Sequence, residues 1–234
     1  MRILVTRPER DAARTAEKLV ALGHQVMIDP VLTIEPVAFE PLAGTFDAIA
    51  VTSASALRMV ERDSRLWSFR ALPLFAVGAH TGAAARATGF ETVSVAEGDA
   101  DALARLIASK LMPGTRILHI AAEERAGDLA ALMEPSKIAV ETLVVYRARP
   151  ARELSAATLR ALEEGTLDAV LHYSPRSAAN LVALADKAGR AAALRRLHHY
   201  CLSVAVAAPL EAAGANTETA ASPDEAALLS LLAP

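Results

Sequence analysis

The sequence contains a single cysteine, Cys201, among its 234 residues. One thiol cannot form a disulfide within the chain, and no Cys-x-x-Cys or clustered Cys/His spacing is present, so the sequence predicts neither a disulfide framework nor a structural metal. Cys201 lies in an apolar run. We interpret it as a small buried residue in a reducing compartment.

The sequence also has no long hydrophobic stretch and no excess of positive charge. No apolar run reaches the roughly 18 residues of a membrane span, and the amino terminus begins with a strand-like segment rather than a signal peptide. We therefore expect a cytoplasmic protein that does not enter a membrane. The net charge of −3, without lysine and arginine runs interleaved with aromatics, disfavours nucleic-acid binding. Any anionic ligand must then be held by local features.

Common catalytic and nucleotide-binding signatures are missing too. Gly78-Ala-His-Thr-Gly82 lacks the Gly-Lys-Ser/Thr ending of a Walker loop and does not fit GxGxxG. There is no Ser/His/Asp order in the context of a nucleophile elbow, and no obvious pair of carboxylates. These absences argue against the conventional hydrolases and nucleotide-binding proteins.

What the sequence does contain is an internal repeat. Asp47–Ser55 resembles Asp168–Arg176, Thr81–Gly89 resembles Val206–Gly214, and two further pairs share an offset of 114 residues, Arg2–Val5 with Arg116–His119 and Val31–Pro36 with Val145–Pro150. A duplicated series of strand and helix units predicts two similar lobes. A cleft between such lobes is where a ligand is expected to bind.

Short apolar runs alternate with amphipathic helical stretches along the whole chain, which predicts an α/β fold of parallel sheets covered by helices on both faces. Thr33–Pro36 and Arg147–Pro150 each end in proline and are interpreted as connectors between the lobes. A boundary near Met112–Gly114 is the alternative. His198 and His199 are predicted to lie in a solvated loop before a strand at 200–204.

Distinctive polar residues follow directly after the predicted strands, where open parallel sheets bind ligands and helix amino termini favour anions. The candidates are Thr6, Arg7, Thr52, Ser53, Ser55, Gly78, Thr81, His172, Ser174 and Arg176. Each hydroxyl has the alternative role of a helix N-cap, which is compatible with shaping an anion site. We expect His172 to be a neutral hydrogen-bonding residue rather than a general base.

Tyr146 is the most distinctive single side chain, because it ends a long apolar strand beside the second connector. Two interpretations stay open from the residues alone. It is either an aromatic that packs the crossover or a phenol that faces the cleft. With a reference pKa near 10, a phenol stays protonated and can donate a hydrogen bond or a proton.

Five motifs in order resemble the uroporphyrinogen-III synthase family. They are Ile3-Leu-Val-Thr-Arg-Pro8, Asp47-x4-Thr-Ser-Ala-Ser55, Ala76-Val-Gly-x2-Thr81-x7-Gly89, Val144-Val-Tyr-Arg-x2-Pro150 and the second Asp168…Ser174 block. The resemblance implies two similar parallel-sheet lobes with flanking helices, joined by a two-stranded connector. Residues 1–34 plus 149–234 would form lobe one and 36–147 lobe two, with connectors near 33–36 and 147–150.

The resemblance also implies the reaction, which is cyclisation of the linear tetrapyrrole hydroxymethylbilane to uroporphyrinogen III. Water is lost and the terminal pyrrole ring is inverted, without a metal or cofactor, by a monomer. Tyr146 matches a candidate proton donor of the family. Thr6, Arg7, Thr52, Ser53, Ser55, Gly78 and Thr81 match positions that line its cleft, and we add His172, Ser174 and Arg176 from the second repeat for a substrate with eight carboxylates.

The sequence departs from the family pattern in its second half. Ala121–Arg125 stands where a Gly/Arg-rich turn is usual, Val206 stands where a hydroxyl is usual, and His172-Tyr173 replaces an apolar residue and a threonine. These departures motivate an alternative function. The chain could be a non-catalytic, two-lobed relative that binds a tetrapyrrole or another polyanion.

Overall fold

The structure is a computed structural model that describes residues 1–40, 44–61, 63–97, 99–125 and 127–232. The chain divides into two compact units. Unit 1 comprises Met1–Thr33 and Arg149–Pro234, and unit 2 comprises Ile34–Ala148. The chain therefore leaves unit 1 once and returns to it once, and the alternative boundary near Met112–Gly114 falls inside unit 2.

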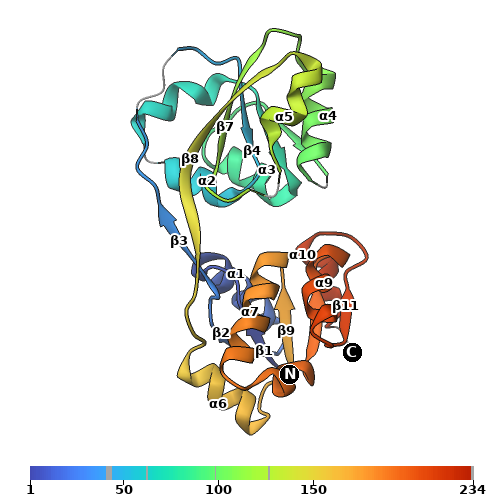
Figure 1. The fold of residues 1–234 in the computed structure, drawn as a ribbon. Helices are drawn as coiled ribbons and strands as arrows, with labels where there is room; N and C mark the ends of the chain where they lie inside the picture. Colours follow the sequence, from blue (N-terminus) through green and yellow to red (C-terminus); the bar gives the residue numbers. More distant parts are fainter. Residues whose placement is uncertain (41–43, 62, 98, 126, 233–234) are drawn as a thin grey trace. The chain divides into compact units, whose positions relative to one another are not determined.

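Unit 1 is built around a parallel sheet whose described strands follow the order β11-β10-β9-β1-β2 (Figure 1). The strands are β1 (Arg2–Val5), β2 (Gln25–Ile28), β9 (Ala169–His172), β10 (His198–Cys201) and β11 (Thr217–Thr219). The helices are α1 (Glu9–Ala21), α6 (Ala156–Glu164), α7 (Pro175–Lys187), α8 (Ala191–Arg195), α9 (Val204–Ala212) and α10 (Glu225–Ser230).

Unit 2 contains a second sheet, ordered β3-β8-β7-β4-β5-β6 within the described residues. Its strands are β3 (Leu32–Pro36), β4 (Ala48–Val51), β5 (Leu74–Val77), β6 (Val93–Ala96), β7 (Arg116–Ala122) and β8 (Ala139–Pro150). Its helices are α2 (Ala54–Val60), α3 (Gly78–Ala87), α4 (Ala100–Lys110) and α5 (Leu129–Met133), with 3₁₀ turns η1 (Ser64–Ala71) and η2 (Glu134–Ser136).

The sequence repeat corresponds to a repeat of strand order. Reading β6-β5-β4-β7-β8 against β11-β10-β9-β1-β2 pairs the strands that carry the repeated segments. The repeated aspartates also make the same contacts. The Asp47 carboxylate accepts from Arg116 N–H at 2.8 Å while Asp47 N–H donates to Arg116 O at 2.9 Å, and Asp168 does the same with Arg2 at 2.6 and 3.0 Å. Each aspartate thus closes the start of its strand pair.

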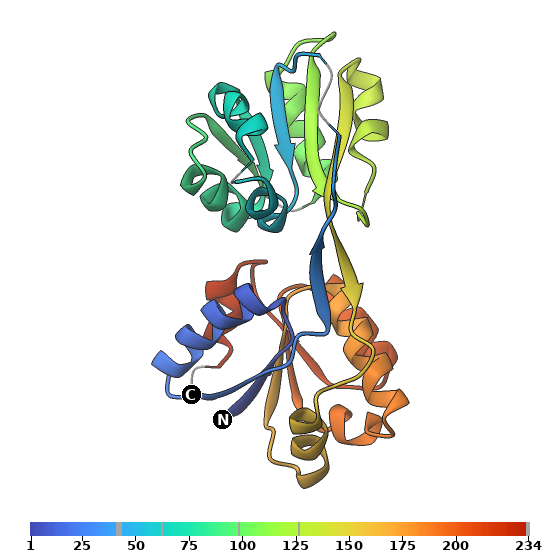
Figure 2. The ribbon, with the colours of Figure 1, turned by 90° about the vertical axis from the view of Figure 1, so that its left-hand side faces the viewer.

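Each sheet is covered on both faces, as Figure 2 shows for unit 1, with α1 and α10 on one side and α6 to α9 on the other. Successive strand residues point to opposite faces, so Ile3 packs with α1 and α10 whereas Leu4 packs with α6 to α8. In unit 2, Ile49 joins the layer of α2 and α3, and Ala50 joins that of α4 and α5. The predicted α/β fold of parallel sheets with flanking helices is therefore confirmed.

The two passages of the chain between the units run through adjacent strands. β3 and β8 are neighbours, and Val37 N–H donates to Val145 O at 3.0 Å while Ala151 N–H donates to Val31 O at 2.9 Å. Since one partner rises in sequence as the other falls, the pair is antiparallel. Arg147 Nε also donates to the Glu35 carboxylate at 2.9 Å.

One expected strand was placed two residues too late. β10 begins at His198 rather than at Tyr200, and α9 begins at Val204. The prediction of a solvated loop at His198 and His199 is wrong for His199, which is buried. The first two residues of β10 are histidines, so the apolar run in the sequence begins only at Tyr200.

Candidate functional site

The carboxyl end of β4 carries the first group of candidate residues. Thr52 and Ser53 follow the strand, and Ser53 is the N-cap of α2, where its hydroxyl accepts from Ser55 N–H at 3.1 Å. Ser55 is itself buried, and its hydroxyl accepts from the Arg58 guanidinium at 2.7 Å. Ser53 therefore has the N-cap role that the sequence offered as an alternative. Thr52 and Ser53 are both half-buried at the edge of the sheet.

The neighbouring strand β5 leads into Gly78 and Thr81. Gly78 has φ +77°, and a Cβ at this position would meet nothing within 4 Å, so backbone conformation rather than space favours glycine. The residue makes a direct turn from β5 into α3. Thr81 is buried in the first turn of that helix. Because β4 and β5 are hydrogen-bonded neighbours, Thr52, Ser53 and Gly78 share one edge.

Tyr146 belongs to β8 and lies beside the end of β7. In the strand order β8-β7-β4-β5, it is on the opposite side of β4 from Gly78. It pairs with Ala122 at an irregularity in the β7–β8 register, and its carbonyl accepts from Glu123 N–H at 2.8 Å. Its side chain is 7% exposed and belongs to the core cluster that contains Ile120 and Val145. The structure thus shows a packing role. The position at the carboxyl edge is compatible with a second role for the phenol.

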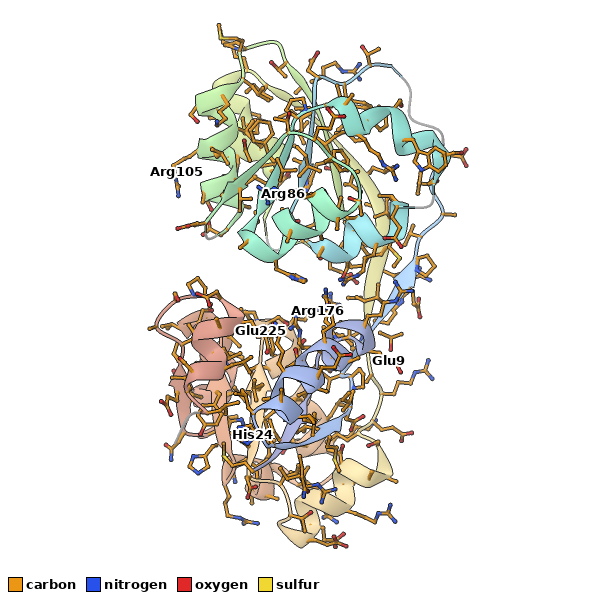
Figure 3. All side chains as sticks on the ribbon, turned by 180° about the vertical axis from the view of Figure 1, so that it is seen from behind. Glu9, His24, Arg86, Arg105, Arg176 and Glu225 are labelled. Carbon is orange, nitrogen blue, oxygen red and sulfur yellow. The ribbon has the colours of Figure 1, made fainter. Side chains whose placement is uncertain are left out.

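The candidates of unit 1 also gather at the carboxyl ends of two neighbouring strands. Thr6 and Arg7 follow β1, and Ser174 and Arg176 follow β9, which pairs with β1. Ser174 caps α7 by accepting from Ser177 N–H at 3.1 Å, and Thr6 is buried. Arg176 is exposed and points away from the end of the unit at which His24 lies (Figure 3).

His172 is a correction to the expected binding set. It is the last residue of β9 and is 0% exposed in the core of unit 1, so it does not line a surface. His199 Nε2 donates to Leu194 O at 2.9 Å, and its Nδ1 must therefore accept from His172 Nε2 at 3.0 Å. Burial first, and then His199, lower the pKa of His172 well below its ordinary value. Its expected neutral, hydrogen-bonding character stands.

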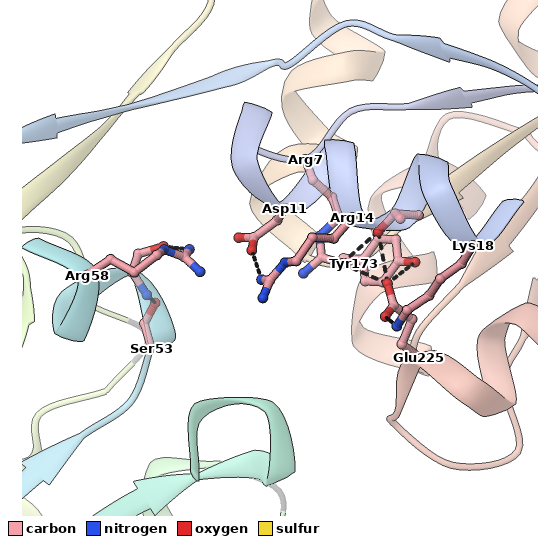
Figure 4. A network of polar contacts seen from close by, with 10 residues as sticks. Arg7, Asp11, Arg14, Lys18, Ser53, Arg58, Tyr173 and Glu225 are labelled. Atoms are coloured by element: carbon pink, nitrogen blue, oxygen red, sulfur yellow. Dashed lines mark hydrogen bonds and ion pairs between the residues drawn. The ribbon is translucent and has the colours of Figure 1, made fainter. Parts of the chain in front are cut away.

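Arg7 is held in a polar network that sequence reasoning missed (Figure 4). Arg7 Nη1 donates to Thr15 Oγ1 at 3.1 Å and to Glu225 Oε1 at 3.1 Å, and its guanidinium carbon lies 3.9 Å from the centre of the Tyr173 ring. The Tyr173 hydroxyl donates to the same Glu225 oxygen at 3.0 Å. Glu225 lies far along the chain from Arg7, so no local motif could have indicated this contact.

The network keeps Glu225 ionised. Burial acts to raise the pKa of Glu225, but hydrogen bonds from Lys18, Thr15 and Tyr173 outweigh it and hold the pKa below its usual range. Burial is also the main reason that the pKa of Tyr173 is raised. At neutral pH the carboxylate is therefore charged and the phenol is protonated, which matches the donor and acceptor roles in the network.

The carboxyl edges of the two sheets both present hydrogen-bond donors. They present hydroxyl groups, helix amino termini and arginines, which suit carboxylates. Within the described residues, no three His, Cys, Asp or Glu side chains converge as metal ligands would, and no helix combines the length and apolar character of a membrane span.

The fold and these edges define a class of α/β proteins whose ligands bind at the carboxyl ends of parallel strands. The family described as uroporphyrinogen-III synthase HemD matches residues 13–230, and the chain belongs to this family. No significant match was found among curated proteins.

Two solved structures show the same fold. One is the uroporphyrinogen-III synthetase of Helicobacter pylori, with 16% identity, a TM-score of 0.70, and coverage of 99% of this chain and 98% of the other. The second is a mutant uroporphyrinogen III synthase of the extremely thermophilic bacterium Thermus thermophilus, with 19% identity, a TM-score of 0.65 and coverage of 99% and 96%.

The family match confirms the family predicted from the five motifs, and with it the enzyme class, while the two solved structures confirm the fold. The chain is an enzyme of haem biosynthesis that cyclises hydroxymethylbilane to uroporphyrinogen III.

Proposed function

We propose that the carboxyl edges of both sheets bind the carboxylates of hydroxymethylbilane. The proposed binding residues are Thr6, Arg7, Ser174 and Arg176 in unit 1, and Thr52, Ser53, Ser55, Gly78 and Thr81 in unit 2. His172 is left out because it is a residue of β9 itself and its Nε2 is bonded to His199 within the core, whereas the buried Thr6, Ser55 and Thr81 lie beyond the ends of their strands. The observation that carries the proposal is the gathering of these residues at neighbouring strand ends. Each unit then acts as one substrate-binding lobe.

The chemistry asks little of the protein beyond positioning. The pyrrole nitrogens of the substrate supply the electrons that expel the terminal hydroxyl group. The enzyme holds one folded conformer, so that the substituted carbon of the terminal ring attacks and a spiro intermediate forms before the ring is inverted. Holding reacting groups in place accounts for a large share of the rate in such reactions. A fold without a conventional catalytic constellation is consistent with this chemistry.

We propose Tyr146 as the acid that protonates the departing hydroxyl, so that it leaves as water. The support is its place at the carboxyl edge beside β7 and its tight packing, which fixes the ring. A phenol carries one proton that it can donate.

Tyr146→Phe tests this role because it keeps the packed ring and removes only the hydroxyl. We expect turnover to fall by roughly ten- to a thousand-fold, the range for lost general acid catalysis. Tyr200→Phe is the matched control, since Tyr200 is also buried but lies on β10 of unit 1. Unaltered turnover in Tyr146→Phe, with Tyr200→Phe also unaltered, removes Tyr146 from the mechanism.

We further propose that the protein works as a cytoplasmic monomer that binds neither nucleic acid nor membranes. The net charge of −3, without lysine and arginine runs interleaved with aromatics, supports the lack of nucleic-acid binding. Sedimentation at micromolar concentration should give the mass of one chain. A species of twice that mass would overturn the proposal of a monomer.

A further inference from the structure

Arg7 is anchored on one side and open on the other. Among the residues that the structure describes, its hydrogen bonds all come from Nη1, to Thr15 and Glu225. One face of the guanidinium lies over the Tyr173 ring at 3.9 Å. The side chain is 18% exposed, and neither Nη2 nor Nε is among the buried polar atoms that lack a partner. The unused edge of the guanidinium therefore faces solvent.

Glu225 is the centre of the anchor. Its Oε1 accepts from Arg7, from the Thr15 hydroxyl at 2.8 Å and from the Tyr173 hydroxyl at 3.0 Å, and its Oε2 accepts from Lys18. The donors come from the end of β1, from α1 and from the end of β9, while Glu225 comes from α10 (Figure 4). Three separate segments are thus tied to one carboxylate, and the Glu225 side chain is only 25% exposed.

This arrangement suits recognition of a carboxylate by a pre-positioned arginine. An arginine loses side-chain freedom when it binds a ligand, and a partner that fixes the guanidinium beforehand removes that cost. The edge formed by Nη2 and Nε can donate two parallel hydrogen bonds to a carboxylate. Thr15 is fully buried and both accepts from Arg7 and donates to Glu225, so the anchor has a rigid base.

We propose that Glu225 is a positioning residue that holds Arg7 so that its open edge binds a carboxylate of the substrate. This inference rests on the proposed function, in which Arg7 binds hydroxymethylbilane. Glu225 itself touches no substrate. Its effect passes through Arg7. Lys18 bonds only the other oxygen of Glu225, so removing Lys18 leaves the hydrogen bond between Arg7 and Glu225 in place.

The test compares Glu225→Ala, Arg7→Ala and their double variant with the wild type. Loss of one charge-assisted contact should raise KM by roughly five- to fifty-fold while kcat changes by less than about two-fold. In the Arg7→Ala background, Glu225→Ala should raise KM by less than about two-fold further, because its effect requires Arg7. Glu225→Gln keeps the acceptor oxygen and should restore part of the affinity. Lys18→Met is the matched control and should leave KM unchanged.

Direct binding separates this inference from the proposed function. Uroporphyrin III, a stable tetrapyrrole with eight carboxylates, serves as a fluorescent probe for the full chain and needs no turnover. Weaker binding in Arg7→Ala and Glu225→Ala but not in Lys18→Met supports the inference even if cyclisation fails. An unchanged affinity in Glu225→Ala, or the same loss with and without Arg7, would overturn it even if cyclisation succeeds. Circular dichroism confirms that each variant is folded.

Discussion

His119 offers a quantitative test of the packing in unit 2. It lies in the middle of β7 between Ala50 and Thr142 and is 2% exposed. Among the described residues, neither of its ring nitrogens has a hydrogen-bond partner. Burial, then the positive charge of Arg125, lower the pKa of His119 from 6.5 to about 4, with Asp128 acting in the opposite direction. The imidazole is therefore neutral in the folded state at pH 5, whereas it is charged in the unfolded chain.

The sign and size of the pH effect follow from this difference. Between pH 6.5 and 4 the unfolded state binds more protons at His119 than the folded state does, so stability falls as the pH is lowered. The stability that depends on neutral His119 is fully present above the pKa of the unfolded chain, 6.5, and is lost as the pH falls toward 4. From pH 7 to pH 5 the loss from this one group is about 2 kcal/mol, at about 1.4 kcal/mol per pKa unit.

His119→Val isolates the effect, because the repeat places Val5 at the equivalent position of β1. Unfolding by urea is followed by the fluorescence of Trp67, the single tryptophan, which lies in unit 2. The free energy of unfolding of the wild type, minus that of the variant, should fall by about 2 kcal/mol between pH 7 and pH 5. Any cavity left by valine cancels in this comparison. An equal difference at the two pH values would refute the neutral, buried state of His119.

Two further predictions concern packing. A Cβ at Gly82 would lie 2.5 Å from Val95 Cγ2, so Gly82→Ala should destabilise unit 2 by about 1–3 kcal/mol. In a Val95→Ala background the same change should become neutral or favourable, because alanine is the better helix former. A penalty that persists in that background would contradict the clash. Cys201 is fully buried, and burial, with Glu211, raises the pKa of its thiol to about 12. A thiol reagent at pH 8 should therefore modify Cys201 only when unit 1 unfolds. Rapid modification of the native protein would contradict this placement.

The fold could be predicted from the sequence because its signals are local and repeated. Strands such as Ala48–Val51 are continuous apolar runs buried on both faces, and a helix follows nearly every one of them. The repeated Asp47 and Asp168 mark equivalent strands in the sequence, and each makes the same contacts with the strand beside it. Local patterns of this kind also located the neighbouring strand ends where the candidate residues gather.

The contacts of individual side chains could not be predicted in the same way. His172 belongs to the same polar cluster as Ser174 and Arg176, yet its ring is fully buried and bonded to His199 in the core of unit 1. His199 looked solvated because its polarity outweighed a weak strand signal. Glu225 contacts Arg7 only because α10 packs against α1, and such a long-range contact leaves no trace in local spacing.

The central claim is that this chain directs the cyclisation of hydroxymethylbilane. The most direct measurement supplies that substrate to the purified protein and determines the isomers of the product. We expect mainly the type III isomer, formed faster than in the absence of protein. Only the type I isomer, at the uncatalysed rate, would contradict the claim and would favour a relative that binds tetrapyrroles without turning them over.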